Sequence, residues 1–111
     1  MKRYCLALDL KDDSTLIAEY EEHHRNVWPE ILQSIKDAGI LQMEIYRVNN
    51  RLFMTMETDD VFSFERKGAM DAENRKVQEW EELMWKYQQA LPGNKLGEKW
   101  RLMDKIFSLN P

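Results

Sequence analysis

Two adjacent histidines, His23 and His24, are the only histidines of the chain, and they lie in the segment EYEEHHRNVWPEI, residues 19–31. An imidazole with an unperturbed pKa of about 6.5 can take up or release a proton near neutral pH, and it is also a common metal ligand. The segment therefore raises two possibilities, proton-transfer chemistry and metal binding.

A metal site at these histidines is disfavoured by their spacing. Adjacent side chains of a regular helix point about 100° apart, so both imidazoles cannot bind one ion. The sequence has no H-E-x-x-H motif, one cysteine and no third histidine. We therefore expect neither zinc nor iron here, and we expect no cofactor.

The helical period separates the two histidines. An apolar stripe runs along the segment, and its members are Ile17, Tyr20, His24, Trp28, Ile31 and Ile35. His24 lies near the centre of this stripe and is predicted to face inward. His23 lies roughly 90° away and is predicted to lie at the surface.

Two interpretations of His24 remain open on this evidence. It could be a core histidine that hydrogen-bonds a backbone carbonyl or the Tyr20 hydroxyl. It could instead be the acid–base group of a site, because Tyr20 and Trp28 flank it with hydrogen-bonding tips and flat apolar faces. That mixture suits a small polar ligand with apolar faces, such as a sugar.

Pro29 is predicted to interrupt the helix. Proline lacks an N–H, clashes with the carbonyl four residues earlier, here Arg25, and pushes the preceding Trp28 out of helical geometry. We expect a kink or a restart at about residues 26–29, with Pro29 in the first turn of the second part. The break could open a pocket or be purely structural.

A second apolar stripe predicts another long helix. Its members are Val77, Trp80, Leu83, Met84, Tyr87 and Leu91. Trp80 and Tyr87 are interpreted as core residues. Trp85 falls roughly 150° from the centre of the stripe, so its indole needs another role: a dimer contact, a contact with a loop, or a wall of a ligand site.

The order of predicted elements gives the fold class. They are a strand at 3–10, a helix at 14–38 ending at Gly39, two alternating strands at 41–48 and 51–58, a helical region at 61–91 broken near residues 71–74, a loop at 91–99 and a final strand at 100–109. This βαββαβ order predicts an α+β, ferredoxin-like fold, with helices on one face of a four-stranded antiparallel sheet.

Length, composition and charge exclude several classes. A chain of 111 residues fits a single domain, 1–111, and the net charge of −4 argues against binding nucleic acid or an anionic membrane. With Cys5 as the one cysteine, no internal disulfide can form. We find no signal peptide or membrane-spanning run, so we expect a cytoplasmic protein.

The face of the predicted sheet that the helices do not cover indicates a binding partner. Phe53 alternates with Met54 and Phe107 with Ile106, so both faces of the strands are partly apolar. Two helical layers cover only one face, and a large exposed apolar face usually meets a partner. We expect a homodimer.

With these residues in view, the chain resembles the L-rhamnose mutarotase family over nearly its whole length. The resemblance rests on the motif E-Y-x-x-x-H-x-x-x-W-P-E in residues 19–30 and on the later segments EIY, LFMTME and WKYQQALP. It implies a small cytoplasmic homodimer, of dimeric α/β-barrel type, that interconverts the α and β anomers of a deoxyhexose without a cofactor. It also implies that His24 is catalytic and that Tyr20 binds the monosaccharide.

Two positions depart from the family pattern. Trp85 matches the second residue of a substrate-binding pair that is typically Trp-Trp, but the first residue of the pair is Met84 here. Met43, three residues before Tyr46, stands where rhamnose-type members carry a substrate-binding tyrosine. We assign Met43, Met84 and Trp85 to the substrate site, and these differences make L-fucose a candidate beside L-rhamnose.

Two alternative hypotheses, which assign the chain to other functional classes of protein, are retained. Dimeric ferredoxin-like proteins also include cofactor-free and haem-degrading monooxygenases, in which a helix histidine can ligate haem. The domain could also be a non-catalytic ligand-binding module. The mutarotase motif favours acid–base catalysis of ring opening and closure, centred on His24, over both.

Overall fold

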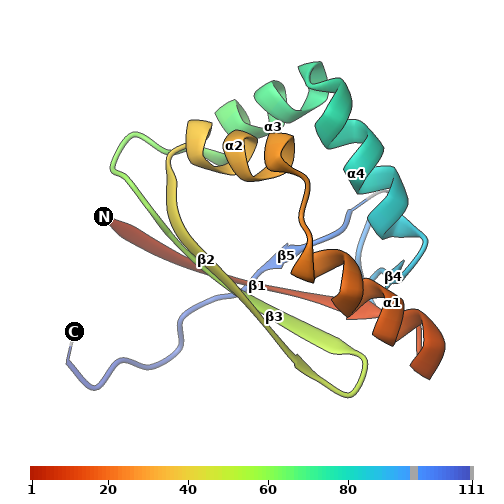
Figure 1. Cartoon of the computed structure of the whole chain (residues 1–111). Coiled ribbons are helices and arrows are strands. Elements are labelled where there is room, and N and C mark those ends of the chain that lie inside the picture. The colour runs from red at the N-terminus through yellow and green to blue at the C-terminus, as the bar shows by residue number, and fades with distance from the viewer. Residues whose placement is uncertain (96–97, 111) are drawn as a thin grey trace.

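The computed structural model describes residues 1–95 and 98–110, which form one antiparallel sheet with helices on one face (Figure 1). In chain order the elements are β1 (Lys2–Leu10), α1 (Ser14–Arg25), α2 (Pro29–Asp37), β2 (Ile40–Val48), β3 (Arg51–Thr58), α3 (Phe64–Glu73), α4 (Arg75–Trp85), β4 (Gln88–Gln89) and β5 (Arg101–Leu102). The ferredoxin-like α+β class is confirmed.

The sheet is built around β1. Its strand order is β2-β3-β1-β4, and β5 also pairs with β1, at Leu6 and Ala7. The side chains of β1 point alternately to the two faces of the sheet, and those of Leu6, Leu8 and Leu10 are buried beneath the helices. None of the helices in the described ranges is long and apolar enough to cross a bilayer.

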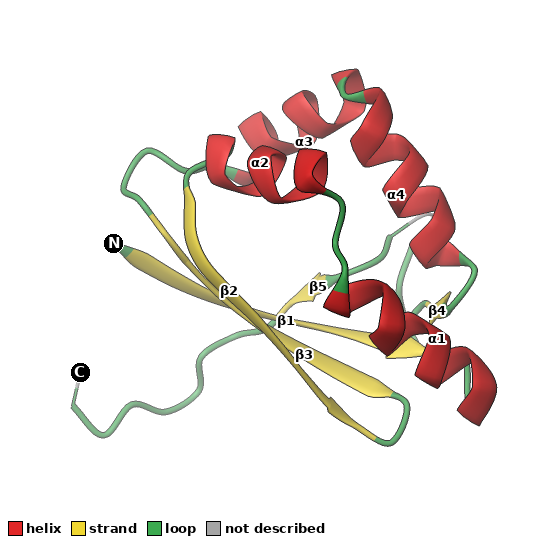
Figure 2. Cartoon of the chain, in the orientation of Figure 1, coloured by secondary structure: helices red, strands yellow, loops and turns green. Residues whose placement is uncertain are grey.

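The predicted break at Pro29 divides the first helical region into α1 and α2 (Figure 2). Asp13 begins α1, because its carboxylate accepts a hydrogen bond from the Leu16 N–H at 3.0 Å. Trp28 adopts an extended conformation (ψ 136°) and Pro29 occupies the first turn of α2. The axes of α1 and α2 therefore point in different directions (Figure 2).

A β-bulge moves one predicted core residue to the surface. The pairing of β2 with β3 shifts by one residue between Ile40 and Gln42, so Leu41 has no partner and is 61% exposed. Ile40, Met43 and Ile45 face the helices instead. The alternation predicted for residues 41–48, which would place Leu41 on the same face as Met43, is therefore wrong at Leu41.

The second helical region also divides in two, at Asn74. The Asn74 side chain accepts hydrogen bonds from Lys76 and Val77 at the start of α4. The predicted helix extended to residue 91, but α4 ends at Trp85, and Tyr87 and Gln88 already lie on the path to β4.

The predicted final strand at 100–109 is largely wrong within this protomer. Only Arg101–Leu102 is assigned to β5, and one further backbone hydrogen bond joins the Met103 N–H to the Cys5 carbonyl. Beyond it the segment leaves the sheet on the side away from the helices (Figure 1), with the side chains of Ile106 and Phe107 95% and 77% exposed. The apolar alternation predicted a strand, but the segment departs from the edge of β1 after Met103, although residues 2–4 of β1 have no other strand partner on that side among the described residues.

Candidate active site

A cavity of about 330 Å³ lies between the helices and the sheet. The strands supply much of its floor through the side chains of Met43, Ile45, Met54 and Met56, while helix residues and the loop before β5 supply the rest. Volumes of this size and walls of this apolar character are typical of small-molecule sites.

His24 reaches this cavity from α1, and its ring is oriented by its own helix. The Nδ1 atom lies 2.9 Å from the Tyr20 carbonyl oxygen, which can only accept, so Nδ1 carries the proton and donates it. The remaining nitrogen, Nε2, then holds a lone pair and is available as a base. His24 bonds a backbone carbonyl, as the first interpretation predicted, and it also lines the cavity, so its role as an acid–base group stays a prediction.

The surroundings of His24 favour its neutral form. Burial lowers its pKa below the usual 6.5, the hydrogen bond to the Tyr20 carbonyl opposes this in part, and the neighbouring His23 lowers it further. The imidazole packs between aromatic rings, 4.4 Å from the Tyr20 ring centroid and 5.7 Å from that of Trp80. At neutral pH His24 is therefore an uncharged, oriented base.

Tyr20 lies beside His24 and is 3% exposed. Its hydroxyl accepts a hydrogen bond from the Gln88 side-chain nitrogen at 3.4 Å. Burial raises the pKa of the phenol to about 12, although the bond from Gln88 works in the opposite direction. Tyr20 is therefore a neutral hydroxyl group that keeps its own proton to donate.

A more open depression shares Tyr20 and His24 with the cavity. An ion pair between Arg47 and Glu21, at 2.6 Å, lies along it and ties β2 to α1. The catalytic candidates of α1 are thus bordered by two hollows, of which the apolar cavity is the more enclosed.

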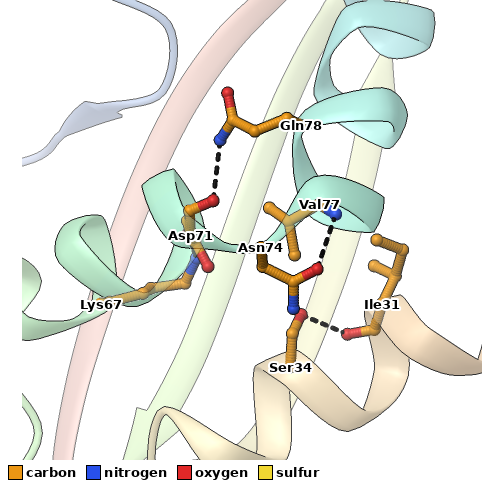
Figure 3. Close-up of polar contacts among 7 residues, drawn as sticks. All are labelled: Ile31, Ser34, Lys67, Asp71, Asn74, Val77 and Gln78. Atoms are coloured by element: carbon orange, nitrogen blue, oxygen red, sulfur yellow. Dashed lines mark hydrogen bonds and ion pairs between the residues drawn. The ribbon is translucent and has the colours of Figure 1, made fainter.

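Charged and polar groups mark the far end of the cavity, where α3 meets α2 and α4. Lys67 pairs with Asp71, and both line the cavity together with Ser34. Figure 3 shows the junction that holds them: Gln78 donates to the Asp71 backbone carbonyl at 2.8 Å, and Asn74 caps α4 at Val77. The cavity thus has polar groups at both ends and apolar walls between.

The structure brings four of the five predicted site residues together. Tyr20, His24, Met43 and Met84 line the cavity, and Trp85 does not. The Trp85 indole is 37% exposed, and the Lys99 ammonium lies 5.2 Å from the centroid of its ring. Of the three roles considered for Trp85, contact with a neighbouring loop is the one seen in this protomer.

His23 is not the free surface residue that the helical phase predicted. Its Nε2 lies 3.2 Å from the Tyr87 hydroxyl, and its ring packs against Tyr87 and the edge of Trp80. It lies outside the residues that line the cavity. The helical phase correctly separated the two histidines, but it could not show that α4 and Tyr87 cover the edge of the stripe.

Several lining residues were missed by sequence reasoning. Trp80, interpreted as core, also lines the cavity, and so do Gln88, Trp100, Lys67 and Asp71. Gln88 gave no signal because it fell inside a predicted helix, beyond the true end of α4. The polar pair of α3 looked like an ordinary solvated helix face.

No cluster of three or more histidine, cysteine, aspartate or glutamate side chains within residues 1–95 and 98–110 is arranged to hold a metal ion. The polar side chains that line the cavity are those of Tyr20, Ser34, His24, Glu81, Gln88 and Lys99, together with the Lys67–Asp71 ion pair of α3.

Comparison with known proteins gives one consistent family. A family model described as L-rhamnose mutarotase matches residues 3–109. An L-fucose mutarotase of Xanthomonas campestris is 47% identical over 112 residues, covering 99% of this chain and 90% of that protein. An L-rhamnose mutarotase of Formosa agariphila is 31% identical, over 80% of this chain and 84% of that protein.

The solved structures agree on the fold. The crystal structure of an L-rhamnose mutarotase from Formosa agariphila superposes with a TM-score of 0.72 at 22% identity, covering 98% of this chain and 99% of that one.

Proposed function

Because this chain belongs to the L-rhamnose mutarotase family, we propose that it interconverts the anomers of a 6-deoxyhexose, L-fucose in the first place, with His24 as the proton carrier. The family makes the chain a sugar mutarotase, an isomerase acting at the anomeric carbon. The identity of the sugar and the roles of individual residues are the proposal.

The observation that carries the proposal is the fixed tautomer of His24. With Nδ1–H bonded to the Tyr20 carbonyl, Nε2 takes the proton of the anomeric hydroxyl. The C1–O1 bond becomes a carbonyl as the bond between C1 and the ring oxygen breaks. The imidazolium gives its proton to the departing ring oxygen, which was bonded to the same carbon and therefore lies close to the same nitrogen.

The open aldehyde then rotates about the C1–C2 bond, and closure repeats the proton movements in reverse. Protons balance at every step, and no electron is transferred, so the reaction as written needs no redox group. Positioned proton transfer contributes about 10²- to 10⁴-fold in rate, which is enough for a reaction that water already supports slowly. The neutral Tyr20 hydroxyl donates a hydrogen bond to the sugar.

The preference for a 6-deoxy sugar rests on the walls of the cavity. Met43 and Met84 replace groups that could hydrogen-bond, and with Ile45 and Met54 they form an apolar surface. The C6 methyl group of a deoxyhexose fits such a surface better than a hydroxymethyl group does. The 47% identity to an L-fucose mutarotase supports L-fucose over L-rhamnose.

The test is saturation-transfer NMR between the two anomers of L-fucose, L-rhamnose and D-glucose, with and without enzyme. We expect the largest acceleration with L-fucose, and its loss in His24→Asn. The matched control is His23→Gln, the neighbouring imidazole outside the cavity, which should keep most of the rate. A folded His24→Asn variant that exchanges anomers at the wild-type rate would refute the role of His24.

We also propose that the enzyme acts as a homodimer in the cytoplasm. The sheet face opposite the helices carries Phe53 and Tyr46, whose ring centroids are 6.4 Å apart, and the segment after β5 exposes Ile106 and Phe107. That face is mixed in character, because Arg3 and Glu57 form an ion pair on it. Sedimentation should give twice the protomer mass of 13.4 kDa; a monomer at micromolar concentration would contradict the proposal.

A further inference from the structure

Gln88, the first residue of β4, is a buried polar residue in the wall of a largely apolar cavity. It is 5% exposed and lines the cavity beside Tyr20. Its side-chain nitrogen donates to the Tyr20 hydroxyl, while its carbonyl oxygen, Oε1, has no hydrogen-bond partner among the described residues. Buried polar atoms are normally paired, so an exception of this kind calls for an explanation.

The hydrogen-bonding groups of Tyr20 and Gln88 determine which ligand group the two residues can bind together. Tyr20 accepts from Gln88 and, as a neutral phenol, still has its own O–H to donate. Gln88 offers a free acceptor next to that donor. A hydroxyl group is the complementary ligand, because it donates to one oxygen and accepts from the other at the same time.

We infer that Gln88 is a specificity-determining residue: its Oε1 accepts a hydrogen bond from one ring hydroxyl of the sugar, and Tyr20 donates to the same hydroxyl. The inference rests on the proposed function, since it assigns a role within that site.

The position of the pair relative to His24 selects the hydroxyl. The His24 ring packs on the Tyr20 ring with centroids 4.4 Å apart, whereas Gln88 lies at the hydroxyl tip of the same tyrosine. The imidazole therefore packs on the ring of Tyr20 and the amide lies at its hydroxyl, so the two groups are placed to contact different atoms of one bound sugar. A sugar whose C1 lies at His24 presents its C3 or C4 hydroxyl to Gln88.

This assignment bears on the choice between sugars. L-Fucose and L-rhamnose have opposite configurations at C2 and C4. If Gln88 binds the C4 hydroxyl, it distinguishes L-fucose from L-rhamnose directly. If it binds the C3 hydroxyl, it binds both sugars in the same way. A site built to bond a hydroxyl discriminates strongly against a sugar lacking it, because its own polar group is then left unpaired.

The experiment compares wild type with Gln88→Met, which keeps the length of the side chain and removes the amide. Saturation transfer is measured on L-fucose and on its 2-deoxy, 3-deoxy and 4-deoxy forms. Wild type should lose about 5- to 100-fold in kcat/KM when the contacted hydroxyl, at C3 or C4, is removed. Gln88→Met should be slower on L-fucose by a similar factor and should no longer distinguish L-fucose from that deoxy sugar.

The matched control is Gln89→Met, the same change at the exposed neighbour in β4, which should keep the wild-type pattern. A Gln88→Met variant that still discriminates as wild type does, or that loses only discrimination at C2, overturns the inference. Those results leave the mutarotase proposal standing, whereas an absence of acceleration by wild type on every sugar would refute the proposed function itself. A thermal melt of each variant separates misfolding from loss of the contact.

Discussion

At the scale of single residues, two neighbouring histidines of α1 acquire different properties from their surroundings. His24 bonds the carbonyl one turn earlier and borders the cavity, whereas His23 is held against Tyr87. The same side chain is therefore a candidate base at one position and a packing group at the next, because the two side chains leave the helix in different directions.

The lowered pKa of His24 predicts the pH dependence of catalysis. Because burial holds this pKa below 6.5, the neutral base predominates at pH 7. The catalysed rate should be flat above pH 6.5 and should fall as the pH drops through the lowered pKa. The check is a pH profile of saturation transfer, corrected for the uncatalysed rate, with an NMR titration of the His24 ring; a midpoint at or above 6.5 would contradict it.

The same shift predicts the sign of a stability change. Between the folded and unfolded pKa of His24 the unfolded chain binds more protons, so the free energy of unfolding should decrease as the pH falls below 6.5. Urea denaturation across this range should show a smaller decrease in His24→Asn than in wild type. Equal decreases in both proteins would show that other groups dominate.

Removal of the Tyr20 hydroxyl tests the buried polar pair. Tyr20→Phe leaves both groups of the Gln88 amide unpaired, and we expect a loss of about 1–3 kcal/mol in stability. We also expect lower kcat/KM, because the sugar loses a donor. The control is Tyr46→Phe on the exposed outer face, which should change neither the melting temperature nor the rate.

At the scale of elements, turns and helix ends determine how the site is assembled. Pro29 separates α1 from α2, Asn74 separates α3 from α4, and a bulge at Leu41 sets which residues of β2 face the helices. Each depends on local backbone chemistry, so the breaks near Pro29 and Asn74 could be predicted from the sequence. The bulge could not, because a one-residue shift in register depends on the partner strand.

Two glycines give opposite predictions for one change. Gly39 ends α2 with φ +93°, and an added Cβ would lie 2.7 Å from the Asp59 carboxylate, so Gly39→Ala should destabilise by about 1–3 kcal/mol. Gly68 lies within α3 with open space around it, so Gly68→Ala should stabilise by about 0.5–1 kcal/mol. Chemical denaturation checks both; a neutral Gly39→Ala would show that the turn relaxes without strain.

At the scale of the whole molecule, two partly apolar surfaces of the protomer are exposed. They are the face of the sheet opposite the helices and the segment after β5. Phe107 and Leu109 remain 77% and 80% exposed, although they belong to an alternating apolar run. A chain of this size rarely exposes such a run without a partner. The cavity, in contrast, is lined within one protomer.

This contrast predicts that assembly and catalysis can be separated. Phe107→Asp should weaken the proposed homodimer and shift its sedimentation toward the monomer, because a charge would then have to be buried in the proposed interface. The rate per protomer on L-fucose should remain within about threefold of wild type, a change of under 1 kcal/mol in the barrier. An unchanged mass would contradict the role of this segment, and Lys105→Asp, a charge change on the same exposed stretch, serves as control.

The sequence by itself determined the order of elements from β1 to α4, the inward direction of His24 and the resemblance to the family. Hydrophobic period, proline and helix-capping residues act over a few positions, and the E-Y-x-x-x-H-x-x-x-W-P-E motif spans only the end of α1 and the start of α2. Such signals are local, so they can be read without knowing what packs against them. Tyr20, Met43 and Met84 followed because the resemblance placed them beside His24.

Only the tertiary structure decided which polar atoms face the cavity. Gln88 meets Tyr20 across 68 positions of sequence, Trp85 contacts the loop before β5, and the run at 103–109 departs from the sheet instead of extending β5. Hydrogen bonding of a buried amide depends on which distant residues enclose it, and no periodic pattern records that. The acid–base group could be recognised from its helix, but the group inferred to recognise the sugar became visible only when β4 was placed against α1.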